Sequence, residues 1–254
     1  MEDKKMKKLI AVLTALCLVL SLAAAVAENV TTIEAGKLLY STSPDFPPFE
    51  YRDDNDNIVG IEPELMELIA GKLGLTAEAV PMDFDGALLA ARVDQGAKVD
   101  AVVSGVTVRE DRKLIFDFTD TYVSITQAIV SKDGAITEEQ LKDVNIGVQS
   151  GTTGMIYAED DYPNVTKYET YSLAFQALQN GQVDCVLLDD MVGNAYVKKL
   201  PGLGMQPTSY EKEDFAFGVN KGNTALVEAI NAALAELKAD GTVDAIIAKY
   251  NEAE

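Results

Sequence analysis

The sequence predicts an α/β protein made of two similar lobes. Short apolar runs alternate with amphipathic stretches along the chain, which is the pattern of an α/β fold. One pattern also occurs twice: a helix, a glycine turn, Val-Asp and an apolar strand, as ALLAARVDQGAKVDAVVSG and LAFQALQNGQVDCVLLDD, with Asp100 and Asp184 at matching positions. The 254 residues, 48% of them hydrophobic, are enough for two cores.

The first half of the chain contains the expected elements of one lobe. Proline is favoured in the first turn of a helix and glycine just past its end, so Pro63 and Gly74 bracket a helix over 63–74. A helix over 86–93 and strands over 37–41, 76–80 and 99–105 complete this part.

The second half follows the same alternation. Thr137 and Gln140 fit a capping box that opens segment 137–143, and a short helix is expected after SGTTG at 150–154. The other expected elements are strands over 145–149 and 183–188 and helices over 173–180, 191–199, 225–238 and 243–251.

Residues 1–27 are predicted to be a secretory signal peptide. Four lysines at 4, 5, 7 and 8 precede a long apolar run, and Ala25-Val26-Ala27 supplies a small-residue cleavage site before Glu28. A retained membrane anchor is the alternative. A lipoprotein modified on Cys17 is disfavoured, because Leu16 stands where a lipidation signal needs a small residue.

Composition excludes several functions. Removing residues 1–27 takes away four lysines and two acidic residues, so the net charge goes from −20 to −22 and nucleic acid is not an expected partner. Without histidine there is no His-based triad and no usual zinc site. Cys185 alone remains after residue 27, so no internal disulfide forms, and its apolar neighbours predict a core residue. SGTTG lacks the Lys-Ser/Thr ending of a phosphate loop, and no cofactor is expected.

The ends of two predicted strands point to a binding site. Ser104-Gly105 closes the first copy of the repeated pattern and Asp189-Asp190 closes the second. Ligands of such sheets bind beyond the carboxyl ends of the strands. A cleft between the two lobes is therefore the expected site.

Several motifs together resemble a known family. SPDFPPFEY with GIEPELMELIA, PMDFDG, SGVTVREDRKLIFDFTDTY, IGVQSGTTG and GQVDCVLLDD occur in the order and spacing of the bacterial extracellular solute-binding proteins of family 3, over about residues 36–252. The resemblance implies the two-lobed periplasmic-binding-protein fold (type II), with two crossover strands that join the lobes and a cleft that closes on ligand. Carried over by position, it places one lobe at 28–124 and 217–254, the other at 125–216, and the crossovers near 121–127 and 214–220.

The resemblance also implies residue roles. Arg112 takes the place of the arginine that binds the ligand α-carboxylate, helped by Ser104, Gly105 and Thr107, and a guanidinium fork matches a carboxylate in two contacts. Asp189 takes the place of the acid that binds the α-ammonium group. Gly151 and Thr153 match positions that add polar contacts from the second lobe. Arg109 is interpreted as a surface residue and Asp190 as an acid at a helix N-terminus.

Three further residues concern the ligand side chain. Phe46 and Phe84 match the aromatic positions that sandwich it, although a core phenylalanine is the alternative for each. Relatives that take amide or cationic side chains often carry aspartate at the position of Ser43, whereas here the nearby acid is Asp45. We therefore hypothesise that the cleft favours a neutral side chain over lysine or arginine.

The resemblance implies an exported, monomeric receptor that delivers a free amino acid to the permease of an ABC importer. The alternative is an exported dehydratase of the same fold, acting on cyclic carboxylates such as arogenate or prephenate. That chemistry needs a pocket acid to protonate a leaving hydroxyl, and only Asp189 suggests one. A sensor half of a membrane kinase would need transmembrane and kinase segments as well.

Overall fold

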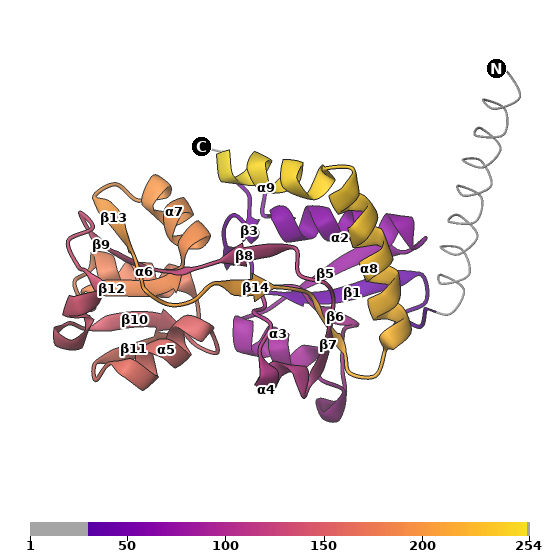
Figure 1. The fold of residues 1–254 in the computed structure, drawn as a ribbon, viewed down its shortest axis with the longest axis horizontal. Coiled ribbons are helices and arrows are strands. Elements are labelled where there is room, and N and C mark those ends of the chain that lie inside the picture. Colours follow the sequence, from indigo (N-terminus) through magenta and orange to yellow (C-terminus); the bar gives the residue numbers. More distant parts are fainter. Residues whose placement is uncertain (1–29, 253–254) are drawn as a thin grey trace, which may run out of the picture.

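The protein has two lobes, each built on a five-stranded sheet (Figure 1). The structure is a computed structural model that describes residues 30–252, so the expected signal peptide lies outside the described residues. The sheet of lobe 1 has the order β5 (Thr76–Pro81), β1 (Lys37–Thr42), β6 (Ala101–Val102), β15 (Gly218–Asn220) and β7 (Phe116–Phe118). The sheet of lobe 2 has the order β11 (Val165–Tyr168), β10 (Ile146–Gln149), β12 (Cys185–Asp189), β9 (Gln127–Lys132) and β13 (Leu203–Pro207).

The two sheets share one topology, as the repeated sequence pattern predicts. In lobe 1, β1 runs parallel to β5 and β6, while β15 pairs antiparallel with β6 and β7. In lobe 2, β10 runs parallel to β11 and β12, while β9 pairs antiparallel with β12 and β13. The first parallel strand of each lobe therefore lies between two others, where both of its edges are paired.

The two matching aspartates, Asp100 and Asp184, make equivalent hydrogen bonds in the two lobes. Asp100 accepts hydrogen bonds from the backbone N–H groups of Ile33 (2.7 Å) and Leu39 (2.9 Å). Asp184 accepts the backbone N–H of Asn145, which precedes β10, at 2.8 Å. Each aspartate thus ties the turn before one parallel strand to the start of its neighbour, which explains why Val-Asp occurs twice.

Helices cover the sheets, and local sequence explains where several of them begin. Asp83 accepts the N–H of Gly86 at 2.8 Å, so α3 starts at Phe84, two residues before the expected position. The capping box of Thr137 and Gln140 is confirmed, but the segment that it opens is a 3₁₀ helix (Glu138–Asp143). Lobe 1 carries α2 (Ile61–Lys72), α3 (Phe84–Ala90), a 3₁₀ turn (Val93–Gln95), α4 (Glu110–Lys113), α8 (Thr224–Ala239) and α9 (Thr242–Glu252); lobe 2 carries α5 (Thr153–Asp161), α6 (Tyr171–Gln179) and α7 (Asp190–Lys199).

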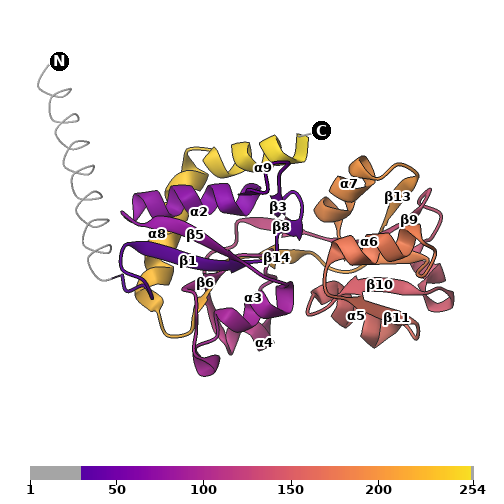
Figure 2. The same cartoon turned by 180° about the vertical axis from the view of Figure 1, so that it is seen from behind.

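Two strands carry the chain from one lobe to the other and back. β8 (Val123–Ile125) pairs antiparallel with β14 (Glu213–Phe215), and both run between the lobes in Figures 1 and 2. The first crossing lies where it was expected. The second lies slightly earlier than 214–220, because β15 at the end of that range is already part of the sheet of lobe 1.

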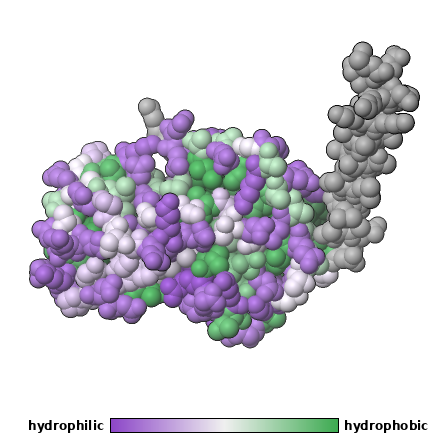
Figure 3. All heavy atoms as spheres, in the orientation of Figure 1, coloured by the Kyte–Doolittle hydropathy of each residue, from purple (hydrophilic) through white to green (hydrophobic). Residues whose placement is uncertain are grey.

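Three further features complete the fold. A small antiparallel sheet of β2 (Asp45–Phe46), β3 (Glu50–Arg52) and β4 (Ile58–Val59) lies on lobe 1. Cys185 is fully buried, as expected of a core residue, and burial raises the pKa of its thiol to about 12. Polar residues occur across both lobes on the face shown in Figure 3, and within 30–252 no helix is both long and apolar enough to cross a membrane.

Candidate ligand-binding cleft

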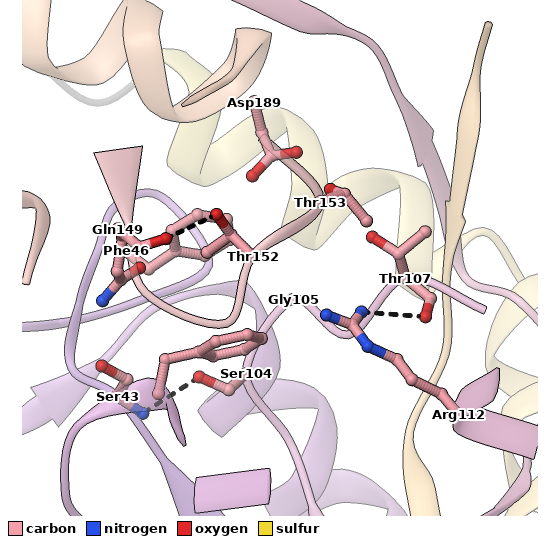
Figure 4. Close-up of a pocket in the computed structure, with 11 residues that line it drawn as sticks. Ser43, Phe46, Ser104, Gly105, Thr107, Arg112, Gln149, Thr152, Thr153 and Asp189 are labelled. Atoms are coloured by element: carbon pink, nitrogen blue, oxygen red, sulfur yellow. Dashed lines mark hydrogen bonds between the residues drawn. The ribbon is translucent and has the colours of Figure 1, made fainter. Parts of the chain in front are cut away.

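A cavity lies between the lobes at the carboxyl ends of the parallel strands β1 and β6 of lobe 1 and β10 and β12 of lobe 2 (Figure 4). Polar groups that follow these four strands face one another across it. This is the position at which sheets of this topology bind ligands. The lining residues are Ser43, Phe46, Phe84, Ser104, Gly105, Thr107, Arg112, Gln149, Thr152, Thr153 and Asp189.

The lobe 1 wall is a loop held from behind by buried acids. Gly105 has a φ of 56°, and its N–H lies 3.0 and 3.1 Å from the two carboxyl oxygens of Glu62. Ser104 donates its hydroxyl to Glu50 at 2.8 Å and accepts the N–H of Ser43 at 3.0 Å. These bonds fix the left-handed turn of the loop and leave its outer face toward the cavity.

Arg112 brings a buried positive charge to this wall. Its guanidinium donates to the carbonyl oxygen of Thr107 at 3.1 Å and, across the cleft, to that of Gly151 at 3.0 Å. The side chain is only 6% exposed, and its carbon Cζ lies 5.7 Å from the centre of the Phe84 ring. Burial lowers the pKa of Arg112 to about 10, so the group stays charged at neutral pH. Among the described residues, only carbonyl oxygens accept hydrogen bonds from this guanidinium, so it can also bind an anion.

Asp189 brings an acid to the opposite wall. It ends β12, is 5% exposed and accepts the Gln127 amide at 2.7 Å. Burial, followed by the negative charges of Glu213 and Asp190, raises the pKa of Asp189 well above its usual value. Asp190 is the first residue of α7 and takes the hydroxyl of Thr126 at 2.7 Å, as suits an acid at a helix N-terminus.

Aromatic rings line the side of the cavity. Phe46 stacks on Phe49 of lobe 1, with ring centres 5.4 Å apart, and on Tyr171 of lobe 2 at 5.7 Å. Phe84 begins α3 beside Arg112. Both phenylalanines are at most 6% exposed, so they are packed residues that also face the cleft. Rings at such a place exclude water and strengthen nearby charged contacts.

The lobes are in contact across the cleft. Asp45 of lobe 1 accepts the N–H of Tyr171 at 2.6 Å, and its carbonyl oxygen accepts the hydroxyl of Tyr196 at 2.9 Å. The cavity between the lobes has room for about one water molecule. The lobes are thus closed more tightly here than they could be around a bound amino acid, which has to enter while the lobes are apart.

The acid nearest to Ser43, Asp45, already accepts hydrogen bonds from other groups of the protein. Asp45 accepts the hydroxyl of Ser43 at 3.0 Å as well as the Tyr171 N–H, and it lines an outer groove instead of the cavity. The polar groups left at this end of the cavity are Ser43, Gln149 and Thr152, all of them neutral.

The structure brings the expected residues together in one cavity, with one difference. Gly151 does not line it, but its carbonyl oxygen accepts from Arg112 at its edge. Sequence reasoning missed Gln149, the last residue of a strand it had placed correctly, and Thr152, whose hydroxyl caps α5 by accepting the N–H of Met155 at 3.1 Å. The strand-end rule that indicated Asp189 would also have found Gln149.

Behind the loop, Glu50 and Glu62 form a fully buried pair of carboxyl groups. Glu62 also accepts the hydroxyl of Tyr122. Burial, and then the charge of Glu62, raise the pKa of Glu50 well above its usual value. These effects favour the protonated form of Glu50 beside the Glu62 carboxyl.

This pair makes the stability of the protein depend on pH. Because the pKa of Glu50 is higher in the folded than in the unfolded chain, its stabilising contribution is complete below the unfolded pKa of about 4.3 and is lost as the pH rises through the folded pKa. Glu50→Gln keeps an acceptor for the Ser104 hydroxyl but does not titrate. We expect its melting temperature to fall less than that of the parent between pH 5 and pH 9.

Thermal unfolding followed by circular dichroism at several pH values measures this difference. Glu67→Gln, on the exposed face of α2, is the control and should follow the parent. Equal losses in the parent and in Glu50→Gln would contradict a raised pKa of Glu50 in the folded protein.

Fold and cleft together define a two-lobed solute-binding protein. The family model of the bacterial extracellular solute-binding proteins, family 3, matches residues 38–253, and the chain belongs to this family. It is 31% identical to the L-cystine-binding protein TcyJ of Escherichia coli (strain K12), over 85% of this chain and 83% of that protein. It is also 31% identical to the arginine-binding extracellular protein ArtP of Bacillus subtilis (strain 168), over 96% of this chain and 98% of that protein.

Solved structures are similar as well. An ancestral arginine-binding protein bound to glutamine has a TM-score of 0.80 and 40% identity, and covers 85% of this chain and 98% of its own. The same kind of protein bound to arginine has a TM-score of 0.79 and 41% identity over the same shares. The two-lobed fold is thereby confirmed.

Proposed function

We propose that this protein is an extracytoplasmic receptor that binds a free amino acid in the cleft and delivers it to an ABC importer. One observation carries the proposal: the cleft holds a buried arginine on one wall and a buried aspartate on the other. The zwitterion of an amino acid carries a negative carboxylate that can pair with the arginine and a positive ammonium group that can pair with the aspartate. The amino-acid-binding names of the relatives support the same function.

The two ends of the ligand backbone would meet different lobes. Arg112 takes the α-carboxylate, with the Thr107 hydroxyl and the loop at Ser104 and Gly105 beside it. Asp189 takes the α-ammonium group, and Thr153 and Gly151 add polar contacts. A ligand that contacts both lobes favours the closed form, because only that form offers all contacts at once.

For the ligand side chain we propose a neutral group. The one acid beside Ser43 is held by the Tyr171 N–H and the Ser43 hydroxyl, and Gln149 offers an amide instead. No free carboxylate among the described residues lines that end of the cavity. The relatives are named for cystine, arginine and histidine, and one structure holds glutamine, so their names do not decide the side chain.

The relatives are binding proteins, which supports a receptor over a dehydratase-like enzyme. Turnover of prephenate or arogenate above a buffer blank would contradict this.

We further propose a monomer with lobe boundaries at 28–124, 125–216 and 217–254, exported with cleavage after Ala27. The intact mass of the exported protein tests the cleavage, and lipid on Cys17 would contradict it.

Closure can be measured in solution. Because the ligand contacts both lobes, saturation with the correct amino acid should lower the radius of gyration in X-ray scattering. The α-amide of the same amino acid, which cannot engage Arg112 as an anion, is the control and should leave the curve unchanged. An unchanged curve with the bound amino acid itself would contradict closure.

A further inference from the structure

Two buried carboxyl groups, those of Asp189 and Glu213, flank the side-chain amide of Gln127 at the end of the cleft where we propose that the α-ammonium group binds. Gln127, the first residue of β9, donates its side-chain nitrogen to Asp189 Oδ1 at 2.7 Å and to Glu213 Oε1 at 3.0 Å. Both acids are 5% exposed. An amide nitrogen has two N–H groups, so these two bonds use both of them. The Thr153 hydroxyl oxygen lies farther from this nitrogen, at 3.4 Å, and is only a weak acceptor for it.

The two acids differ in their other oxygen. Glu213 Oε2 accepts the hydroxyl of Thr107 at 2.8 Å, so both oxygens of Glu213 are hydrogen-bond acceptors. Asp189 faces the cavity, and no other side chain in the described part of the protein donates to it. Hydrogen bonds therefore connect Thr107, Glu213, Gln127 and Asp189 in series. They lead from the loop of Ser104 to Thr107, through the crossover strand β14, to the acid that we propose binds the α-ammonium group.

The surroundings do not neutralise both acids. Arg112 is the one cation that faces them in the described structure, and it already serves the other end of the cleft. Burial and the charge of Glu213 raise the pKa of Asp189, which shifts it toward the protonated form when no ligand cation is present. The titratable groups around the pair on the surrounding elements are Asp190, Arg112, Tyr122, Tyr157 and Tyr171. Asp190 and Arg112 interact with the pair through their charges, and the three tyrosines are affected by the charge of Asp189.

Resting on the proposed function, we infer that Glu213 is a specificity-determining residue for the ligand's ammonium group. Its negative charge, beside Asp189 on the same Gln127 amide, makes Asp189 hold either a proton or a ligand cation. Binding of an amino acid then moves the proton from the Asp189 carboxyl to solvent, while the α-ammonium keeps its own protons. An α-keto or α-hydroxy acid brings no cation to replace that proton and is rejected.

Proton release is the measurement that a purely structural role would not change. We would titrate the parent with its amino acid by calorimetry from pH 5 to pH 8, at each pH in two buffers of different ionisation enthalpy. We expect release of up to one proton per bound ligand at the acidic end, and an affinity that rises by up to about tenfold per pH unit there. Release should vanish once the pH exceeds the pKa of Asp189 in the free protein.

Glu213→Gln assigns the effect to Glu213. A glutamine can still accept from Gln127, and its amide can donate to the Thr107 hydroxyl, so the bonds remain while the charge is gone. Proton release should then shift to lower pH by one unit or more. The matched control is Asp214→Asn, the next residue of β14, which is exposed and should behave like the parent.

The outcomes separate this inference from the function on which it rests. Binding without any buffer dependence from pH 5 to pH 8, or release in Glu213→Gln at the same pH as in the parent, would overturn the inference and leave the receptor intact. Failure of the parent to bind any amino acid would overturn both. If Glu213→Gln does not fold, the absence of proton release in the parent still overturns the inference.

Discussion

Arg112→Ala and Asp189→Ala are each expected to weaken amino-acid binding by roughly 30-fold to several-thousand-fold, equivalent to about 2–5 kcal/mol. Each residue would meet one charged end of the ligand in a cleft with almost no room for water. Removing one partner leaves a ligand charge uncompensated there, which costs more than the bond alone. Calorimetric titration of both variants measures the loss.

Two neighbours serve as controls. Arg109 pairs with Asp111 at 3.0 Å on the surface, and Asp190 is bonded to Thr126, so Arg109→Ala and Asp190→Ala should change affinity by less than about tenfold. The α-amide and α-keto analogues of the ligand should fail to bind the parent. If Asp190→Ala loses binding while Asp189→Ala keeps it, the roles assigned to these acids are wrong.

Gly105→Ala is expected to cost about 2–6 kcal/mol of folding stability and to disrupt the cleft. Its φ of 56° costs a non-glycine residue about 1–3 kcal/mol. A Cβ would also lie 2.3 Å from Phe46 Cε1 and 3.1 Å from Phe215 Cε2. Phe46 is packed against Phe49 and Tyr171 and cannot yield freely, and such overpacking costs about 1–3 kcal/mol more. Urea unfolding gives the stability.

Gly96→Ala separates the two causes. Gly96 has a φ of 72° in the same lobe, but a Cβ at this residue would meet no atom within 4 Å, so only the backbone cost applies. We expect it to be less destabilising than Gly105→Ala and to bind ligand like the parent. Equal losses of stability in the two variants would show that Phe46 does not constrain the loop.

Most helices and the parallel strands β1, β5, β6, β10 and β12 could be predicted, because local sequence determines them. The repeated Val-Asp pattern predicted two similar lobes, and Asp100 and Asp184 indeed hold equivalent strand starts. Strands β11 and β13 were missed, because their residues are largely exposed or half-buried and show no apolar run. The short strands β2 to β4 depend on pairing with one another, which no local pattern reveals.

The first contacts of the cleft could be predicted, but not what supports them. Residues at strand ends and in the family motifs pointed to nearly the whole lining. The positions of Glu50, Glu62 and Glu213 depend on tertiary packing: Glu62 reaches Gly105 from α2, and Glu213 reaches Thr107 from a crossover strand. Sequences separated by 43 and 106 residues meet there only in the folded protein.

Calorimetric titration of the mature protein with each of the twenty amino acids is the decisive test of the receptor function and of the neutral pocket. We expect at least one amino acid with a neutral side chain to bind with nanomolar to low-micromolar affinity, while lysine and arginine bind far more weakly. Arginine binding in that range would contradict the neutral pocket. Binding of no amino acid at all would contradict the receptor function.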